Sequence, residues 1–257
     1  MSRHFNFRRF GMLFKQHIAE QYKSYLMSLV VLTGFLALIM GFVAYVQDRP
    51  LNVTMQEFMF IMPLLLAGAI FSSNTFAALG DKKKAIASLT LPASHLEKYL
   101  LGWLFSYVIF LILYTASFYG VLTVVLSMDN WHGEEKQVLN IFSGNTFKNV
   151  VGAYAMVHAV ALVGSVYFEK GHFIKTAFVF FIFMVVLVTL NEQVMQLVLG
   201  HDVAATPLGQ VRFTENDRLF IVAPPEAVSK WISTISSIVL IGILWLASYA
   251  RLREKQV

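Results

Sequence analysis

The sequence contains no cysteine, and charged side chains make up only 14% of its 257 residues. Without cysteine the chain can form no disulfide, bind no metal through a thiolate and use no cysteine nucleophile. The motifs G-x-x-x-x-G-K-[ST], H-E-x-x-H and G-x-S-x-G are also missing, so a P-loop nucleotide site and two common hydrolase sites are excluded. We expect neither a catalytic centre nor a metal or cofactor bound by this chain.

Apolar residues, in contrast, are abundant. They make up 57% of the sequence, whereas soluble domains contain about 45–50%, and the mean hydropathy is +0.64. They gather in six runs that approach the roughly 20 residues a helix needs to cross a bilayer, without the alternation of barrel strands. We expect an all-α polytopic membrane protein with a single transmembrane domain over 1–257. The expected spans are 25–46, 58–79, 99–128, 150–168, 172–190 and 232–250.

Residues 2–24 precede the first run and predict an amphipathic helix. The apolar residues that recur there at i+3 and i+4 spacing are Phe7, Phe10, Phe14, Ile18 and Tyr22. They share one helix face, and the basic residues lie largely off it. This pattern is typical of a helix in the membrane interface, although a helix packed on a soluble domain would show it too.

The distribution of charge predicts the orientation in the membrane. The N-terminal segment, the 80–98 loop, the turn at 169–175 and the C-terminus together carry 14 of the 20 Lys and Arg but only 5 of the 15 Asp and Glu. Because Lys and Arg accumulate on the cytoplasmic side, both termini are expected in the cytoplasm. The net charge of +5 therefore reflects topology rather than nucleic-acid binding.

The largest external loop is then 191–231. Within it, residues 211–222 contain two β-compatible runs around a polar centre, which predicts a hairpin.

The polar stretch 79–99 predicts a short helix, a break and the start of the third span. Asp81 can cap the short helix, and Pro92 ends it because proline donates no N–H. Ser94 and Glu97 then fit a capping box that opens the next helix.

The short helix combines a basic first turn with an apolar face. Its candidate docking residues are Asp81, Lys82, Lys83, Lys84, Ile86 and Leu89. An amphipathic helix on the basic side of a membrane suggests a docking element for a soluble partner. A loop that serves only to fix topology would carry the same positive charge.

Few polar residues interrupt the spans. His158 lies near the middle of the fourth span, where an ionisable residue is a functional candidate, yet a neutral histidine bonded to a neighbouring helix is an equally physical reading. Ser73 and Asn74, near the cytoplasmic end of the second span, could line a pathway or mark the helix end. The spans have no acidic or basic residue near their centres, which argues against a proton-driven transporter.

Two segments, SLTLPASHLEKYLLGWL (88–104) and GSVYFEKGHFIKTAF (164–178), resemble the membrane subunits of bacterial ABC exporters of the type-2 permease class. The resemblance implies a coupling helix at 81–90 that docks on an ATPase, and a location in the bacterial cytoplasmic membrane. It also implies two ATPase chains that bind ATP and Mg, and a second permease that is identical or related.

These observations favour a non-catalytic permease subunit of an ATP-driven exporter. The alternatives are a membrane scaffold without transport, and a membrane-embedded enzyme that uses His158.

Overall fold

The computed structural model describes residues 5–47, 51–77, 93–128, 136–144, 146–200, 203–207, 209–215 and 218–255. The helices in these residues are α1 (Phe7–Val46), α2 (Val53–Ser73), α4 (His95–Trp103), the π-helical segment η2 (Leu104–Ile109), α5 (Phe110–Met128), α6 (Thr146–Tyr167), α7 (His172–Leu199) and α8 (Glu226–Lys255). The strands are β1 (Val203–Ala205), β2 (Val211–Glu215) and β3 (Arg218–Val222).

Six helical segments of the described residues are long and apolar enough to cross a membrane. The third, His95–Met128, joins α4, η2 and α5 end to end. The chain is therefore a mostly helical protein that fits a multi-pass membrane protein, as the apolar runs predicted. The sides on which its termini lie remain a prediction.

Helix α1 is continuous over 40 residues and joins the two segments that were expected as an interfacial helix and a first span. Its first turn is capped by Asn6, whose side chain accepts hydrogen bonds from the backbone N–H groups of Arg8 and Arg9. No glycine or proline occurs between residues 12 and 33, so the sequence offers no residue that would break the helix there. The interfacial position of residues 7–24 remains a prediction.

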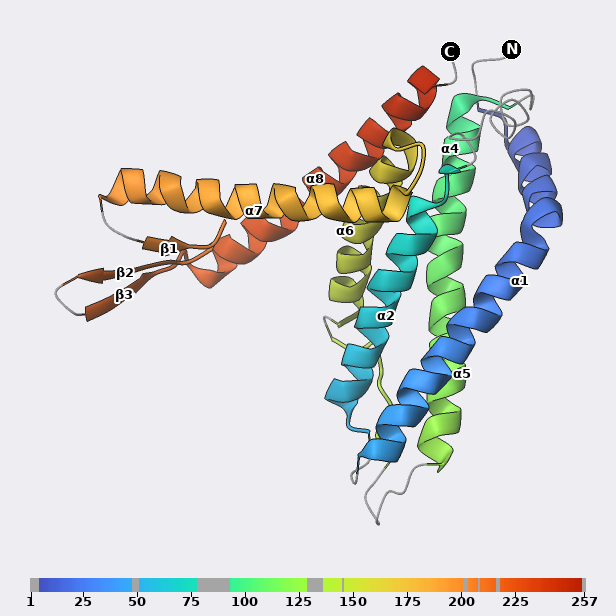
Figure 1. Cartoon of the computed structure of the whole chain (residues 1–257), viewed down its shortest axis with the longest axis horizontal. Helices are drawn as coiled ribbons and strands as arrows, with labels where there is room; N and C mark the ends of the chain where they lie inside the picture. Colours follow the sequence, from blue (N-terminus) through green and yellow to red (C-terminus); the bar gives the residue numbers. More distant parts are fainter. Residues whose placement is uncertain are drawn as a thin grey trace.

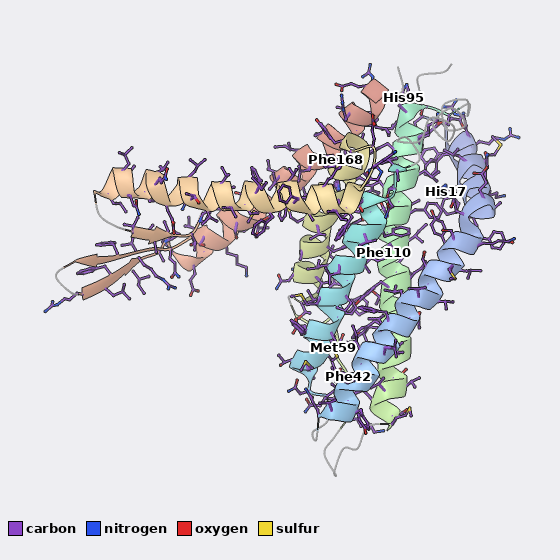
Figure 2. The ribbon with its side chains drawn as sticks, viewed as in Figure 1. His17, Phe42, Met59, His95, Phe110 and Phe168 are labelled. Carbon is purple, nitrogen blue, oxygen red and sulfur yellow. The ribbon has the colours of Figure 1, made fainter. Side chains whose placement is uncertain are left out.

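Helices α1, α2, α5 and α6 form an elongated bundle (Figure 1), in which α2 packs on α6 and α1 on α5. Aromatic rings fill its core. Phe110, labelled in Figure 2, lies with its ring centre 5.2 Å from that of Phe71 and 5.8 Å from that of Tyr154. The hydroxyl of Tyr114 donates to the carbonyl of Phe60 at 2.7 Å. These contacts join three helices through buried side chains.

The end of the bundle at which α2 begins is closed by Gln56, which is completely buried. Its amide nitrogen donates to the carbonyls of Leu51 and Gln137, and its oxygen accepts the N–H of Leu139. A single side chain thereby fastens the segment 136–144 to α2 and satisfies backbone groups that burial would otherwise leave unpaired.

Helix α7 runs crosswise to the bundle and leads away from it (Figure 1). A tight turn at Gly171, whose φ of 66° is left-handed, makes this change of direction within the turn expected at 169–175. We call α7, strands β1 to β3 and the N-terminal half of α8 the arm. The hairpin predicted at 211–222 is confirmed, since Val211 pairs with Val222 and Glu215 with Arg218. The segment 191–199, expected in the external loop, instead continues α7.

The close approach of α2 and α6 depends on Gly68. A Cβ added there would overlap the ring of Tyr154, whereas nothing lies within 4 Å of a Cβ added at Gly120 on α5. We expect Gly68→Ala to lower the free energy of unfolding by about 1–3 kcal/mol through overpacking. Gly120→Ala is the matched control and should be neutral or stabilising by up to about 1 kcal/mol through helix propensity. Unfolding in mild detergent measures the stability of both variants. Equal effects of Gly68→Ala and Gly120→Ala would contradict the close packing of α2 on α6.

Candidate functional site

The predicted coupling helix lies outside the residues that the structure describes. Its residues Asp81, Lys82, Lys83, Lys84, Ile86 and Leu89 fall in the interval between 77 and 93. The structure does describe both flanks of this interval, which are the end of α2 and the start of α4.

Ser73 and Asn74 end α2 through local hydrogen bonds. The Ser73 hydroxyl and the Asn74 side-chain amide both donate to the carbonyl of Ile70, at 2.9 and 2.8 Å. Ser73 is buried and Asn74 is exposed, and in the described residues neither shares a hydrogen bond with His158. Their bonds satisfy a carbonyl that the helix end leaves without an intrahelical partner, which favours their interpretation as a helix terminus.

His158 lies on α6 at the centre of a buried polar cluster with Ser106 and Trp245. Its side chain is completely buried. Trp245, on α8, donates its indole N–H to Nδ1 of His158 at 3.2 Å, and Nε2 lies 2.9 Å from the hydroxyl of Ser106 in η2. Because indole can only donate, Nδ1 must be the acceptor, and a neutral ring then carries its proton on Nε2.

The hydrogen bonds continue beyond the imidazole into the backbone of α4 and η2. The Ser106 hydroxyl accepts a hydrogen bond from the Nε2–H of His158 and donates to the carbonyl of Gly102, in α4, at 2.7 Å. Tyr154 donates to the carbonyl of Ser106 at 2.6 Å. A π-helical turn shifts backbone bonding from i+4 to i+5 and occurs frequently at functional sites. Here the π-helical turn presents the hydroxyl and the carbonyl of Ser106 to His158 and Tyr154 on α6.

Aromatic rings enclose this cluster. The ring of Tyr107 lies 5.4 Å from Tyr154, 5.1 Å from His158 and 5.8 Å from Trp245. The hydrogen bonds of His158 involve neither a carboxylate nor a second ionisable group, and the described residues hold no group of three or more metal-ligating side chains. The cluster joins α6, η2 and α8 through an imidazole, a serine hydroxyl and an indole.

A second polar contact, between Arg9 and Glu97, was not predicted. The Arg9 guanidinium donates Nε to Oε2 of Glu97 at 2.8 Å and Nη2 to Oε1 at 2.7 Å. The Glu97 side chain is completely buried, while that of Arg9 is 25% exposed. The ion pair is bidentate, which is the strong geometry for arginine and a carboxylate.

Glu97 also accepts two backbone hydrogen bonds, from the N–H groups of Asn6 and Ser94 at 2.9 and 2.8 Å. The bond from Ser94 completes the predicted capping box, which is confirmed. The sequence indicated the cap because Ser94 and Glu97 are three residues apart, but nothing local could indicate Arg9, which lies 88 residues away. One carboxylate thus holds the starts of α1 and α4 together.

Comparison of the chain with models of protein families, with curated proteins and with solved structures found no match. The resemblance to exporter membrane subunits therefore remains a prediction from two sequence segments.

The Trp245–His158 bond predicts thermodynamic coupling between α6 and α8. His158→Leu removes the acceptor of the indole N–H of Trp245, a partly buried residue, and an unpaired buried donor costs about 1–3 kcal/mol. Trp245→Phe removes the donor from the other side. We expect the double variant to lose less free energy of unfolding than the sum of the single losses, by about 0.5–3 kcal/mol. Trp231→Phe, at an exposed position of the same helix, is the control, and its effect should add to that of His158→Leu. If the effects of Trp245→Phe and His158→Leu were also additive, the coupling would be refuted.

The Arg9–Glu97 pair predicts a similar pattern between α1 and α4. Removing one partner of a buried ion pair costs about 3–5 kcal/mol, because the other charge stays buried alone. Arg9→Leu should therefore destabilise strongly, because the Glu97 carboxylate left behind is completely buried, and Arg9→Leu combined with Glu97→Leu should recover part of the loss. Arg8→Leu is the control, because Arg8 is exposed. The midpoint of thermal unfolding in detergent measures the stability of each variant. If the double variant lost as much stability as the two single variants together, the coupling of Arg9 and Glu97 would be contradicted.

Proposed function

We propose that this protein is the permease subunit of an ATP-driven exporter of the ABC type. It would work in a bacterial cytoplasmic membrane with separate ATPase subunits and a second permease, and it would itself bind no nucleotide. The observation that carries the proposal is the placement of the segment between α2 and α4. Its two flanks lie at the same end of the bundle as the start of α1 and the end of α8 (Figure 1).

Charge at this end of the bundle supports a cytoplasmic position. Arg8, Arg9, Lys98, Arg251 and Arg253 all lie on helix turns that approach this end. His95, labelled in Figure 2, marks the start of α4 there. Basic residues at membrane ends favour the cytoplasmic side, where a soluble ATPase would be present.

The Arg9–Glu97 pair supports a mechanical role for the segment 78–92. A docking loop can transmit movement only if at least one of its ends is fixed to a rigid element. The start of α4 is fixed by a bidentate ion pair and a capping box, and α4 continues without interruption into η2 and α5. A displacement of the loop would therefore move the third span and α1 together.

Transport itself would take place between this chain and the second permease. The centre of the bundle is filled by hydrogen-bonded aromatic side chains such as Tyr114 and Tyr154, both completely buried. A pathway at the interface of two subunits leaves this core intact. His158, Ser73 and Asn74 then serve as helix contacts and a helix end.

Replacing the apolar face of the predicted coupling helix tests the proposal. We expect Ile86→Asp with Leu89→Asp to abolish copurification of a P-loop ATPase with the tagged chain from its native host, because two buried carboxylates would face the partner. The matched control is Val138→Asp with Phe142→Asp, two exposed apolar residues at the opposite end of the bundle, which should retain the ATPase.

Two outcomes would overturn the proposal. A wild-type chain that captures no ATPase even after crosslinking would instead indicate a membrane scaffold. An ATPase that stays bound to the Ile86→Asp and Leu89→Asp variant, with transport intact, would show that docking occurs elsewhere.

A further inference from the structure

The outermost strand of the arm, β3, leaves one edge open. The sheet order in the described residues is β1-β2-β3, and β2 occupies one edge of β3 over its whole length, from Arg218 to Val222. Alternate residues of an antiparallel strand direct their N–H and C=O groups to opposite sides. The N–H and C=O groups of β3 that point away from β2 therefore form a row with which another strand can pair.

The side chains of β3 are apolar and exposed on both faces. Leu219, Phe220, Ile221 and Val222 are exposed by 64, 42, 55 and 58%. Soluble edge strands are normally protected by charges or proline, yet the only charged residue of β3 is Arg218, at its first position. Lipid could cover these side chains but could not pair the backbone groups. A further strand satisfies both requirements.

The chain as a whole also exposes far more surface than a compact chain of its mass does. The protein exposes 16800 Å² at a mass of 29.0 kDa, whereas a compact monomer of that mass exposes about 11,000 Å². The excess is larger than the roughly 800 Å² that each partner contributes to a standard interface. A dimer that covers β3 and part of the arm therefore has ample area available.

We propose that β3 pairs antiparallel with β3 of a second copy of this chain, around a two-fold axis at Phe220. The strand is self-complementary in this arrangement, since Phe220 faces its own equivalent and Leu219 faces Ile221. The two Arg218 side chains lie at opposite ends, each across from Val222, so like charges do not meet. The same patch serves both copies, as an isologous interface requires, and the two sheets join into one.

This inference deepens the proposed function and rests on it in one respect, because it assigns the second permease to an identical chain. Its structural content is independent of the ATPase. Pairing at β3 can fail while the ATPase still binds, and a β3 dimer can form in a chain that binds no ATPase. The two experiments thus fail separately.

Single-cysteine crosslinking of the full chain in membranes tests the pairing, and the absence of native cysteine makes the readout unambiguous. Phe220→Cys should form a crosslink of twice the monomer mass under mild oxidation, because directly opposed Cβ atoms lie about 4.5–5.5 Å apart. Arg212→Cys is the control. Arg212 is exposed on β2, and three strand spacings of about 4.8 Å keep its two copies at least about 14 Å apart, so no crosslink should form.

A second pair of variants separates edge pairing from general apolar contact. In the Phe220→Cys background, Leu219→Lys with Ile221→Lys should abolish the crosslink, because lysines would then oppose lysines. Leu197→Lys with Val198→Lys adds the same charge at exposed positions of α7 and should leave the crosslink intact.

Coexpression of two differently tagged copies identifies the partner, and both tags should appear in the crosslinked species. Three results would overturn the pairing: no crosslink at Phe220→Cys, equal crosslinking at Arg212→Cys, or a crosslink to a protein other than this chain.

Discussion

The arrangement of the helices at the end of the bundle where α1 and α4 begin depends on the buried carboxylate of Glu97. It accepts four hydrogen bonds, two from Arg9 and one each from the backbones of Asn6 and Ser94. A charge with no exposed surface is tolerated only when it is fully paired, so the starts of α1 and α4 must stay together. The position of α4, and of η2 and α5 that continue it, follows from this requirement.

The same physical rule explains the polar groups inside the bundle. An apolar environment penalises each unpaired donor or acceptor, and the buried Gln56, Tyr114 and Tyr154 all use backbone carbonyls as partners. His158 uses two side chains on two other elements. Each of these residues joins segments that are distant in the sequence, so few polar side chains are enough to fix how the helices pack.

Features with a local signature could be predicted from the sequence. The six apolar segments, the capping box of Ser94 and Glu97, the turn at 169–175 and the hairpin at 211–222 each depend on the order of neighbouring residues, and each appears in the structure. The continuity of α1 was missed because its polarity changes near residue 24 although its helix propensity does not. The pairing of Glu97 with Arg9 and of His158 with Ser106 could not be predicted, since nothing in a single sequence specifies contacts across 88 or 52 residues.

The uninterrupted length of α1 has a mechanical consequence. A helix of 40 residues measures about 60 Å at 1.5 Å per residue, which is about twice the thickness of the hydrocarbon layer. Such a rod behaves as a lever, because without a hinge a tilt at one end is transferred to the other. A push of a few ångströms on the N-terminal turns, where α1 is bonded to α4, would pivot the helix and shift its far end near Val46 in the opposite direction.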